Sequence, residues 1–511
     1  MKRREWVRAA AGAVLAGIGA WLLWPVSRGR HTTESLVLHA GVCKVPTTLL
    51  KAASKAKATA VVFHGLGGNR GVMRGLGHSL AASGADVYLV DFSGHGDSKE
   101  SFSFGRVEEC AAAAVGTLVR ERGLRPDQTV LIGHSLGGAT AVRLADRFSV
   151  AATIAISPAP LELPRRMPVN LLVISAKYDL PQFWRVAEQL VQAGGGVREK
   201  AEDLREKRAV RHIVVPAAQH ASLLLDKDVW LESVRWWQRA LDVRAGSDRF
   251  FGKRIAVGTA VGALGIMLMV PLAASGMCAA FRVSRMQELG GNVAARRVLA
   301  EWAVAGMFAA GVLKFWVPLG WLRIYNGDYL ASCLLLAGVV LAALAQPRDW
   351  QGRPIQLVEG RGDQLWRVAG VATILGMAVT MATAGWVNWE LTDAWPIAER
   401  CWRFSVLVII FVPYLWAEEK VLGPPGEKGI RRWALYLAMR GLLWLAMILG
   451  LFVLDSGAVL MLLFVLYLLT ISALQRMGSD TVRKRTGSAL AAAVFGAIVA
   501  AWFVASVFPI T

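Results

Sequence analysis

The sequence predicts an α/β domain with a mostly parallel sheet, joined to an all-α polytopic membrane region and preceded by one N-terminal membrane helix. Between about residues 30 and 250, short apolar runs alternate with helical patterns, which is typical of a parallel sheet flanked by helices. After residue 250, long apolar runs are separated by short basic loops. The chain is 55% hydrophobic over 511 residues, which is too apolar for a single soluble domain.

The first 30 residues are expected to form a signal-anchor helix in the membrane. An apolar run at residues 9–25 follows four basic residues, Lys2, Arg3, Arg4 and Arg8. This pattern also fits a secretory signal peptide, but residues 26–30 offer no cleavage site with two small residues. We therefore expect the helix to stay attached, with its N-terminus in the cytoplasm, because positive residues favour that side.

The α/β domain is expected over residues 31–243, with a linker at 244–254. Its predicted strands lie at 35–39, 42–45, 58–63, 86–90, 129–132, 152–156, 171–174 and 212–215. The first two form a hairpin, and the others are apolar enough to be buried on both faces of the sheet. The predicted helices lie at about 70–83, 104–123, 135–148, 181–193, 197–208 and 221–242.

The most informative motif is Gly133-His134-Ser135-Leu136-Gly137, between a predicted strand and a predicted helix. Strand, Gly-x-Ser-x-Gly and helix in this order form a nucleophile elbow, a sharp turn that holds the serine oxygen out of the sheet. Glycines fit the two outer positions because a Cβ there would collide with the neighbouring strand and helix. The alternative is a glycine-rich turn with an incidental serine, but the context favours Ser135 as a nucleophile.

A second glycine-rich stretch, His-Gly-Leu-Gly-Gly at residues 64–68, directly follows the strand at 58–63. Ligands bind at this edge of such sheets. The glycines allow a backbone N–H, that of Leu66, to approach a substrate oxygen closely. Together with the N–H of Leu136, it would face a developing oxyanion. A plain loop is the alternative, and the nearby elbow makes it the weaker one.

Two further candidates follow later strands, in the order that this elbow architecture uses. Asp179 comes after the next-to-last predicted strand, and His220 comes after the last one. His220 would take a proton from Ser135, and Asp179 would hold the imidazole in the correct tautomer. Asp179 could instead cap the helix that follows it. His212 competes with His220, but it begins its strand and so belongs to the opposite edge of the sheet.

On these motifs, residues 35–243 resemble the α/β-hydrolase superfamily, and within it the esterase, lipase and thioesterase-like members. The stretches at 64–67, 91–98 and 133–138 match motifs of that family in order. The resemblance implies a serine hydrolase that forms an acyl-enzyme, with a structural turn at 91–98. Many lipases of the family insert a helical cap, whereas only residues 157–170 connect the two corresponding strands here. We therefore expect no large cap.

No cofactor, metal or nucleic acid is expected as a partner. All eight histidines lie at or before His220, and no cysteine pair has the spacing of a metal site. The net charge of +20 comes largely from the loops between apolar runs, which is a sign of membrane topology. Cys43 and Cys110 of the α/β domain either pair or remain free thiols, and the sequence leaves this open, as it does the oligomeric state.

Eight apolar runs near the roughly 20 residues that a membrane helix needs follow the α/β domain. They lie at about 255–276, 302–322, 328–345, 367–388, 403–416, 433–454, 457–474 and 488–509. Lysine and arginine gather in every second loop, around 282–297, 348–367, 420–432 and 476–485. The positive-inside rule makes these loops cytoplasmic. The α/β domain and the C-terminus are then expected on the other side of the membrane, in a bacterium the periplasmic side of the inner membrane.

The leading hypothesis is a membrane-bound serine hydrolase whose partners are the lipid bilayer and a small-molecule or lipid ester or thioester. Acyl transfer and peptide cleavage would use the same residues. The alternative is a transporter or lipid-handling membrane protein with a fused hydrolase or acyltransferase domain, because eight helices exceed what anchoring needs. Two charges within the runs, Lys314 and Arg440, bear on this choice. The simpler interpretation is that both snorkel towards a membrane surface.

Overall fold

The computed structural model describes residues 3–27, 32–52, 54–243, 250–286, 294–315, 320–344, 362–423, 425, 429–454 and 465–511. The chain forms two compact units. The sheet unit comprises Gly17–Gly262 with two short segments, Ala384–Trp395 and Pro509–Thr511. The helical unit comprises Met1–Ala16, Ala263–Thr383 and Pro396–Phe508. Residues 244–249 of the predicted linker lie outside the described residues.

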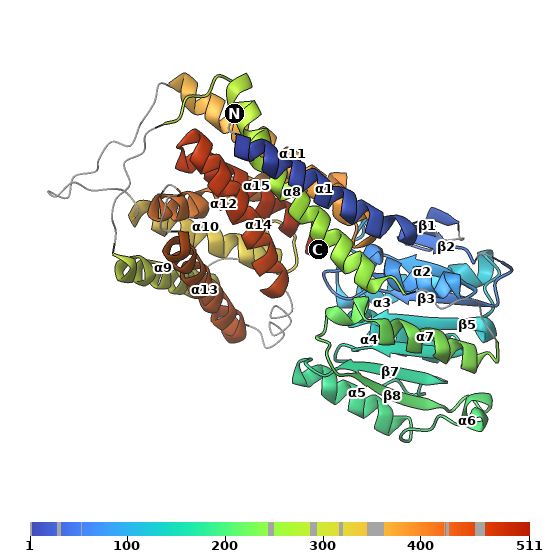
Figure 1. The fold of residues 1–511 in the computed structure, drawn as a ribbon. Helices are drawn as coiled ribbons and strands as arrows, with labels where there is room; N and C mark the ends of the chain where they lie inside the picture. The colour runs from blue at the N-terminus through green and yellow to red at the C-terminus, as the bar shows by residue number, and fades with distance from the viewer. Residues whose placement is uncertain are drawn as a thin grey trace. The chain divides into compact units, whose positions relative to one another are not determined.

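The sheet unit is built on an eight-stranded sheet in the order β1-β2-β4-β3-β5-β6-β7-β8 (Figure 1). β1 pairs antiparallel with β2, and β2 with β4, whereas the later pairings are parallel. The predicted α/β fold with an opening hairpin is therefore confirmed. The strands are β1 Thr33–Ala40, β2 Cys43–Leu50, β3 Ala58–Phe63, β4 Ala85–Val90, β5 Thr129–His134, β6 Ala152–Ile156, β7 Leu171–Ala176 and β8 Val210–Val215.

Helices cover both faces of this sheet, which is why its central strands are apolar throughout (Figure 1). α2 and α7 pack on one face, where Leu80 and Trp230 join Val62 in a single core. α4 and α5 pack on the other, where Val142 and Leu190 belong to a second core. The helices of this unit are α2 Arg74–Ala82, α3 Phe104–Glu121, α4 Leu136–Arg147, α5 Pro181–Ala193, α6 Ala201–Arg205 and α7 Lys227–Ala240.

One predicted helix is much shorter than its sequence pattern indicates. Of the helix expected at 197–208, only α6 forms. The backbone of Arg198 pairs with that of Val210 in both directions, at 2.8 and 2.7 Å. Arg198 therefore lies against the edge strand β8, and the chain turns into a helix only after it.

Two other predicted helices begin with a separate 3-10 turn. Ser222–Leu225 forms such a turn before α7, because Asp226 accepts a hydrogen bond from the N–H of Asp228 at 2.8 Å and so caps the main helix. Arg70–Met73 forms another before α2. Its cap is Asn69, whose side-chain oxygen accepts from the N–H of Gly71 at 2.9 Å.

The connection between β6 and β7, residues 157–170, contains no helix, and all of these residues are described. Its short length predicts this, since a helical cap needs more chain. The carboxyl edge of the sheet is therefore not covered by a cap from this connection.

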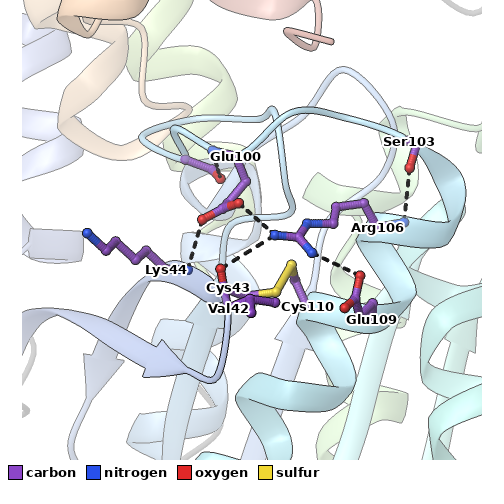
Figure 2. The surroundings of a disulfide bond; sticks show 9 residues. Val42, Cys43, Lys44, Glu100, Ser103, Arg106, Glu109 and Cys110 are labelled. Atoms are coloured by element: carbon purple, nitrogen blue, oxygen red, sulfur yellow. Dashed lines mark hydrogen bonds and ion pairs between the residues drawn. A yellow bond between two sulfur atoms is a disulfide. The ribbon is translucent and has the colours of Figure 1, made fainter.

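A disulfide joins the start of β2 to α3. Cys43 and Cys110 form the bond, with their Cα atoms 5.5 Å apart (Figure 2). Arg106 lies beside it and pairs with Glu100 and Glu109, each at 3.0 Å. The bond closes a loop of 67 residues. Because such a cross-link restricts the unfolded chain, it stabilises the sheet unit by about 4 kcal/mol.

Seven helices among the described residues are long and apolar enough to cross a membrane. They are α1 Arg3–Ser27, α8 Gly252–Ala280, α9 Ala295–Phe315, α10 Gly327–Leu344, α11 Gly362–Glu390, α13 Gly429–Leu454 and α15 Ala489–Val507. α12 (Ala398–Leu422) and α14 (Val465–Thr486) overlap the predicted spans at 403–416 and 457–474 but are not among the seven. The count of nine spans stays a prediction, and the basic residues at 348–361 lie outside the described residues.

The two charges singled out within the apolar runs have different surroundings. Arg440 of α13 is buried and donates from Nε to Glu418 of α12 at 2.7 Å. It therefore has a protein partner of opposite charge, and snorkelling is not needed to explain it. Lys314 is exposed, and its ammonium lies 5.2 Å from the ring centre of Phe315.

Candidate active site

Ser135 occupies the tight turn between β5 and α4. Its φ of 55° is in the region that favours glycine, which costs a residue with a side chain about 1–3 kcal/mol. The flanking glycines make the turn possible. A Cβ on Gly133 would lie 2.0 Å from the carbonyl oxygen of Gly137, and a Cβ on Gly137 would lie 2.3 Å from that of Phe63. This strained, tightly packed turn is the geometry that a nucleophile elbow requires.

Asp179 and His220 lie side by side because the loops after β7 and β8 run together. The N–H of Lys177 donates to the carbonyl of Val215 at 3.0 Å, and the N–H of Tyr178 to that of Ala218 at 3.1 Å. These bonds extend the pairing of the two strands. They bring Nδ1 of His220 to 3.0 Å from Oδ2 of Asp179 and 3.1 Å from Oδ1.

The other ring nitrogen of His220, Nε2, is buried and has no hydrogen-bond partner among the described residues. The ring is held from two sides, with the Phe183 ring centre at 4.2 Å and the His134 ring centre at 4.6 Å. His134 donates from Nε2 to the carbonyl of His220 at 3.1 Å. Burial lowers the pKa of His134 well below its usual range, so this neighbour stays neutral. His220 is thus an oriented imidazole with one nitrogen left unpaired.

The glycine loop, residues 64–68, passes directly beside the elbow. A Cβ on Gly65 would lie 3.1 Å from the Cβ of Ser135, so a side chain there would crowd the elbow. The loop contains a turn in which the N–H of Gly68 donates to the carbonyl of Gly65 at 3.0 Å. Leu66 lies within this turn. Leu136, the other predicted donor, is the first residue of α4, where backbone N–H groups have no partner within the helix.

The sequence of this part of the chain matches a known family. Residues 60–285 match a family model described as the alpha/beta hydrolase family. This part of the chain has the α/β hydrolase fold. The match starts within β3 and ends just after α8. No curated protein matches the sequence.

Several solved structures are similar to the chain. They include an arylesterase, a dienelactone hydrolase from Anabaena variabilis and a bacterial heroin esterase, with 13%, 18% and 16% sequence identity. The TM-scores are 0.32, 0.32 and 0.34. The matches cover 45%, 41% and 46% of this chain and 92%, 98% and 90% of those chains. Each similarity therefore concerns less than half of this chain.

One residue of the site was not found from the sequence. Ser157, the first residue after β6, donates from Oγ to the carboxylate of Asp179 and lies 3.0 Å from Nδ1 of His220. Its φ of 42° is positive. The signal available in the sequence was its place at the carboxyl end of a strand in this hydrolase sheet. The sequence predicted only that residues 157–170 connect two strands without a cap.

Two other histidines of the hydrolase sheet have structural surroundings. His64 donates from Nδ1 to the carbonyl of Gly65 at 2.7 Å and accepts from the N–H of Phe92 at 3.1 Å. Both of its nitrogens are used, and burial lowers its pKa to about 4. His212 lies within β8, where Nε2 is 2.9 Å from Oγ of Ser175. Neither is placed to act on Ser135. Among the described residues, no group of three or more His, Cys, Asp and Glu side chains is arranged to hold a metal ion.

Proposed function

We propose that this protein is a membrane-bound serine hydrolase that cleaves ester or thioester substrates through an acyl-enzyme on Ser135. The observation that carries the proposal is the state of His220. Nδ1 is hydrogen-bonded to Asp179, whereas the buried Nε2 has no partner among the described residues. A histidine arranged in this way beside a nucleophile elbow is ready to accept a proton from the serine.

In the proposed reaction, Oγ of Ser135 attacks the substrate carbonyl carbon while its proton moves to Nε2 of His220. Asp179 stabilises the imidazolium that forms. The tetrahedral intermediate then collapses, and the alcohol or thiol leaves with the proton from His220. Water attacks the acyl-enzyme in the second half, again giving its proton to His220. The second tetrahedral intermediate then collapses, the bond to Oγ of Ser135 breaks, His220 returns the proton to this oxygen, and the acid product leaves.

The developing oxyanion would be stabilised by the backbone N–H groups of Leu66 and Leu136. The approach of Gly65 to Ser135 supports this role for the glycine loop. A donor of this kind contributes about 3 kcal/mol of transition-state stabilisation. No catalytic cofactor is needed for this chemistry.

Ser157 is a second serine beside His220, and its geometry supports an orienting role. It contacts Nδ1, the same nitrogen that Asp179 binds. A serine on that side would need the carboxylate to move before it could use His220 as a base. We propose that Ser157 orients Asp179 and the imidazole of His220. One such hydrogen bond contributes about 1 kcal/mol.

Labelling with a fluorophosphonate probe tests this assignment on the full chain. We expect the wild type to be labelled and Ser135→Ala to lose the label, because the nucleophile is gone. Ser157→Ala is the matched control, and we expect it to be labelled about fivefold more slowly. Label that persists in Ser135→Ala and disappears in Ser157→Ala would reverse the assignment. A wild type that takes no label and hydrolyses no aryl ester would contradict the proposed function.

Location outside the cytoplasm is part of the proposal. The Cys43–Cys110 disulfide supports it, because such bonds persist in oxidising compartments. The segments Ala384–Trp395 and Pro509–Thr511 belong to the sheet unit. The loop between the predicted spans at 367–388 and 403–416 and the C-terminus are both predicted on the non-cytoplasmic side, as is the α/β domain. The two segments in the sheet unit agree with this prediction. A membrane-impermeant fluorophosphonate applied to intact cells should therefore label Ser135. Labelling only after lysis would place the hydrolase part in the cytoplasm.

The substrate class is proposed from the surroundings of the site. The connection at residues 157–170 contributes no helical cap over the carboxyl edge, and the membrane helices keep the enzyme beside lipid. We therefore propose lipid or lipid-linked acyl groups as natural substrates. Aryl esters of increasing chain length, offered in bilayers, test this idea. A preference for acetyl over long acyl chains would favour a general esterase instead.

A further inference from the structure

A short segment from far along the chain belongs to the sheet unit. Ala384–Trp395, here named the returning segment, comprises the end of α11 and the residues after it. Its Trp386 donates from Nε1 to the carbonyl of Thr259 at 3.2 Å. Its polar residues contact the 3-10 turn at 70–73 and the start of α2, directly after the glycine loop.

The first group of contacts is centred on Asn69, the residue that follows the glycine loop. Its Nδ2 donates to the carbonyl of Asp393 at 2.7 Å. Its Oδ1 accepts from the N–H of Asp393 at 3.1 Å and from Oγ1 of Thr392 at 3.2 Å. A Cβ on Gly71 would lie 2.5 Å from the backbone nitrogen of Asp393. The backbone of the returning segment thus fits against this turn at close range.

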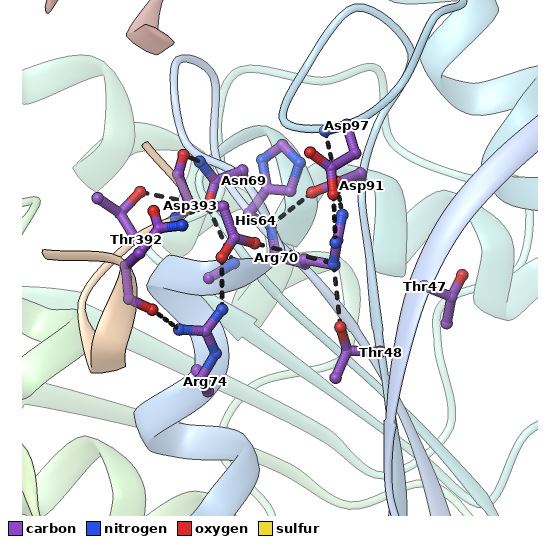
Figure 3. A network of polar contacts seen from close by, with 12 residues as sticks. Thr47, Thr48, His64, Asn69, Arg70, Arg74, Asp91, Asp97, Thr392 and Asp393 are labelled. Carbon is purple, nitrogen blue, oxygen red and sulfur yellow. Dashed lines mark hydrogen bonds and ion pairs between the residues drawn. The ribbon is translucent and has the colours of Figure 1, made fainter. Parts of the chain in front are cut away.

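The second group of contacts is ionic and is centred on Asp393. Its carboxylate lies 2.5 Å from Arg74 and 3.8 Å from Arg70 (Figure 3). Arg70 also pairs with Asp91 and, at 2.5 Å, with Asp97. The returning segment is therefore joined through Arg70 to the loop that follows β4.

Two more bonds hold the same segment to α2. Arg74 donates to the carbonyl of Asn388 at 2.8 Å. His78 and Glu390, both buried, meet at 3.1 Å between Nε2 and Oε2. Several independent contacts, rather than one surface ion pair, place the segment on this helix.

The glycine loop has two ends, and the returning segment holds one of them. At the start of the loop, β3 and the hydrogen bonds of His64 fix the backbone. At its end, Asn69 is bonded to Thr392 and Asp393. Between these points the backbone is glycine-rich and Gly67 has a φ of 71°, so local preferences alone do not fix it. A donor N–H in this stretch depends on both ends for its position.

We propose that the returning segment positions the glycine loop for catalysis, with Asp393 as a positioning residue that acts through Asn69. This inference rests on the proposed function, because it concerns the oxyanion donor at Leu66. A displacement of about 1 Å in such a site can reduce the rate about 100-fold. Full activity of the α/β part of the chain would then depend on the returning segment, which comes from the part of the sequence that contains the predicted membrane helices.

The test uses the full chain with Asp393→Ala, Asn69→Ala and the double variant. Asp127→Ala is the matched control, because Asp127 also pairs with an arginine, Arg125 at 2.8 Å, but lies before β5 at the opposite edge of the sheet. Aryl ester hydrolysis is measured per active site, counted with the fluorophosphonate. We expect kcat to fall about 10- to 100-fold in each single variant, while KM changes less than about threefold and the control matches the wild type.

The double variant and amide exchange separate positioning from a purely structural contact. If Asp393 acts through Asn69, the double variant will be no slower than the slower single variant. Amide exchange of residues 64–69 should rise in both single variants and not in the control. Unchanged kcat per active site together with unchanged exchange would overturn the proposal. If the wild type shows no hydrolysis at all, the proposed function fails, and the exchange of residues 64–69 still decides whether the segment holds the loop.

Discussion

Two clusters of buried polar side chains, one in each unit, differ in how their hydrogen-bonding groups are used. In the sheet unit, Asp179 and Ser157 surround His220, and Nε2 of the imidazole has no partner among the described residues. In the helical unit, Glu418 lies 2.7 Å from Arg440 and 3.6 Å from Arg476.

The comparison shows that burial of polar groups does not by itself mark a reactive site. A buried charge is costly unless an opposite charge faces it, and the helical cluster satisfies this with pairs that join α12, α13 and α14. Arg440 also meets Gln475 at 3.2 Å. These contacts give the charges a structural explanation and do not favour a transport site. Nitrogens of Arg476 in the helical cluster also lack a hydrogen-bond partner among the described residues, but a guanidinium cannot accept a proton. In the sheet unit, the unpaired nitrogen is Nε2 of a histidine beside the strained turn of Ser135, which is the arrangement that proton transfer needs.

The largest expected effect is on the rate, from the sheet cluster. His220→Ala should reduce kcat at least about 10⁴-fold, because the base that accepts the Ser135 proton is removed. The free energy of unfolding should change by less than about 2 kcal/mol. Hydrolysis of an aryl ester and urea denaturation in detergent measure the two quantities. His212→Ala is the control, and activity within a few-fold of the wild type is expected there. Equal losses of activity in His220→Ala and His212→Ala would contradict the assignment of His220 as the base.

The second effect is on stability, from the helical cluster. Glu418→Gln leaves the guanidinium groups of Arg440 and Arg476 without this carboxylate, which should cost about 3–5 kcal/mol. Fluorophosphonate labelling of the folded fraction should stay at the wild-type rate. Glu301→Gln is the control, since Glu301 pairs at 2.8 Å with the exposed Arg297, and such a surface pair is worth less than about 1 kcal/mol. Loss of labelling without loss of stability in Glu418→Gln would assign the cluster a role in the reaction.

The smallest effect concerns Asp91, a buried carboxylate of the sheet unit that does have an arginine partner. Burial raises its pKa to about 6, although Arg70 opposes the shift. Between about pH 4 and pH 6 the unfolded chain therefore releases this proton and the folded protein keeps it. Stability from this group is lost as the pH rises through that range, by about 3 kcal/mol in total. Asp91→Asn should remove this part of the pH dependence, as measured by denaturation at pH 4 and pH 7 against the wild type. The same pH dependence in both proteins would show that Asp91 does not carry it.

The parts of the site that depend on local rules were predictable from the sequence. The spacing of Gly133 and Gly137 around Ser135 is readable from five consecutive residues, although the contact that excludes a Cβ on Gly137 is with Phe63 of β3. The apolar runs of the sheet follow from burial on both faces. The split of the helix at 221–242 was missed because Asp226 is one polar residue within a continuous helical pattern, and its capping role depends on the turn before it.

Other parts of the molecule were decided only by the tertiary structure. The pairing of Cys43 with Cys110, the contact of Ser157 with Asp179, and the place of Asp393 beside Asn69 join segments that are far apart in sequence. Neither hydrophobic period nor motif spacing carries information on such contacts. The sequence by itself determined the class of fold, the strained serine turn and the order of the candidate triad, because each arises from steric and hydrophobic preferences of neighbouring residues. The folded chain decided which polar groups are paired and which nitrogen is left free, because only packing brings their partners within hydrogen-bonding distance.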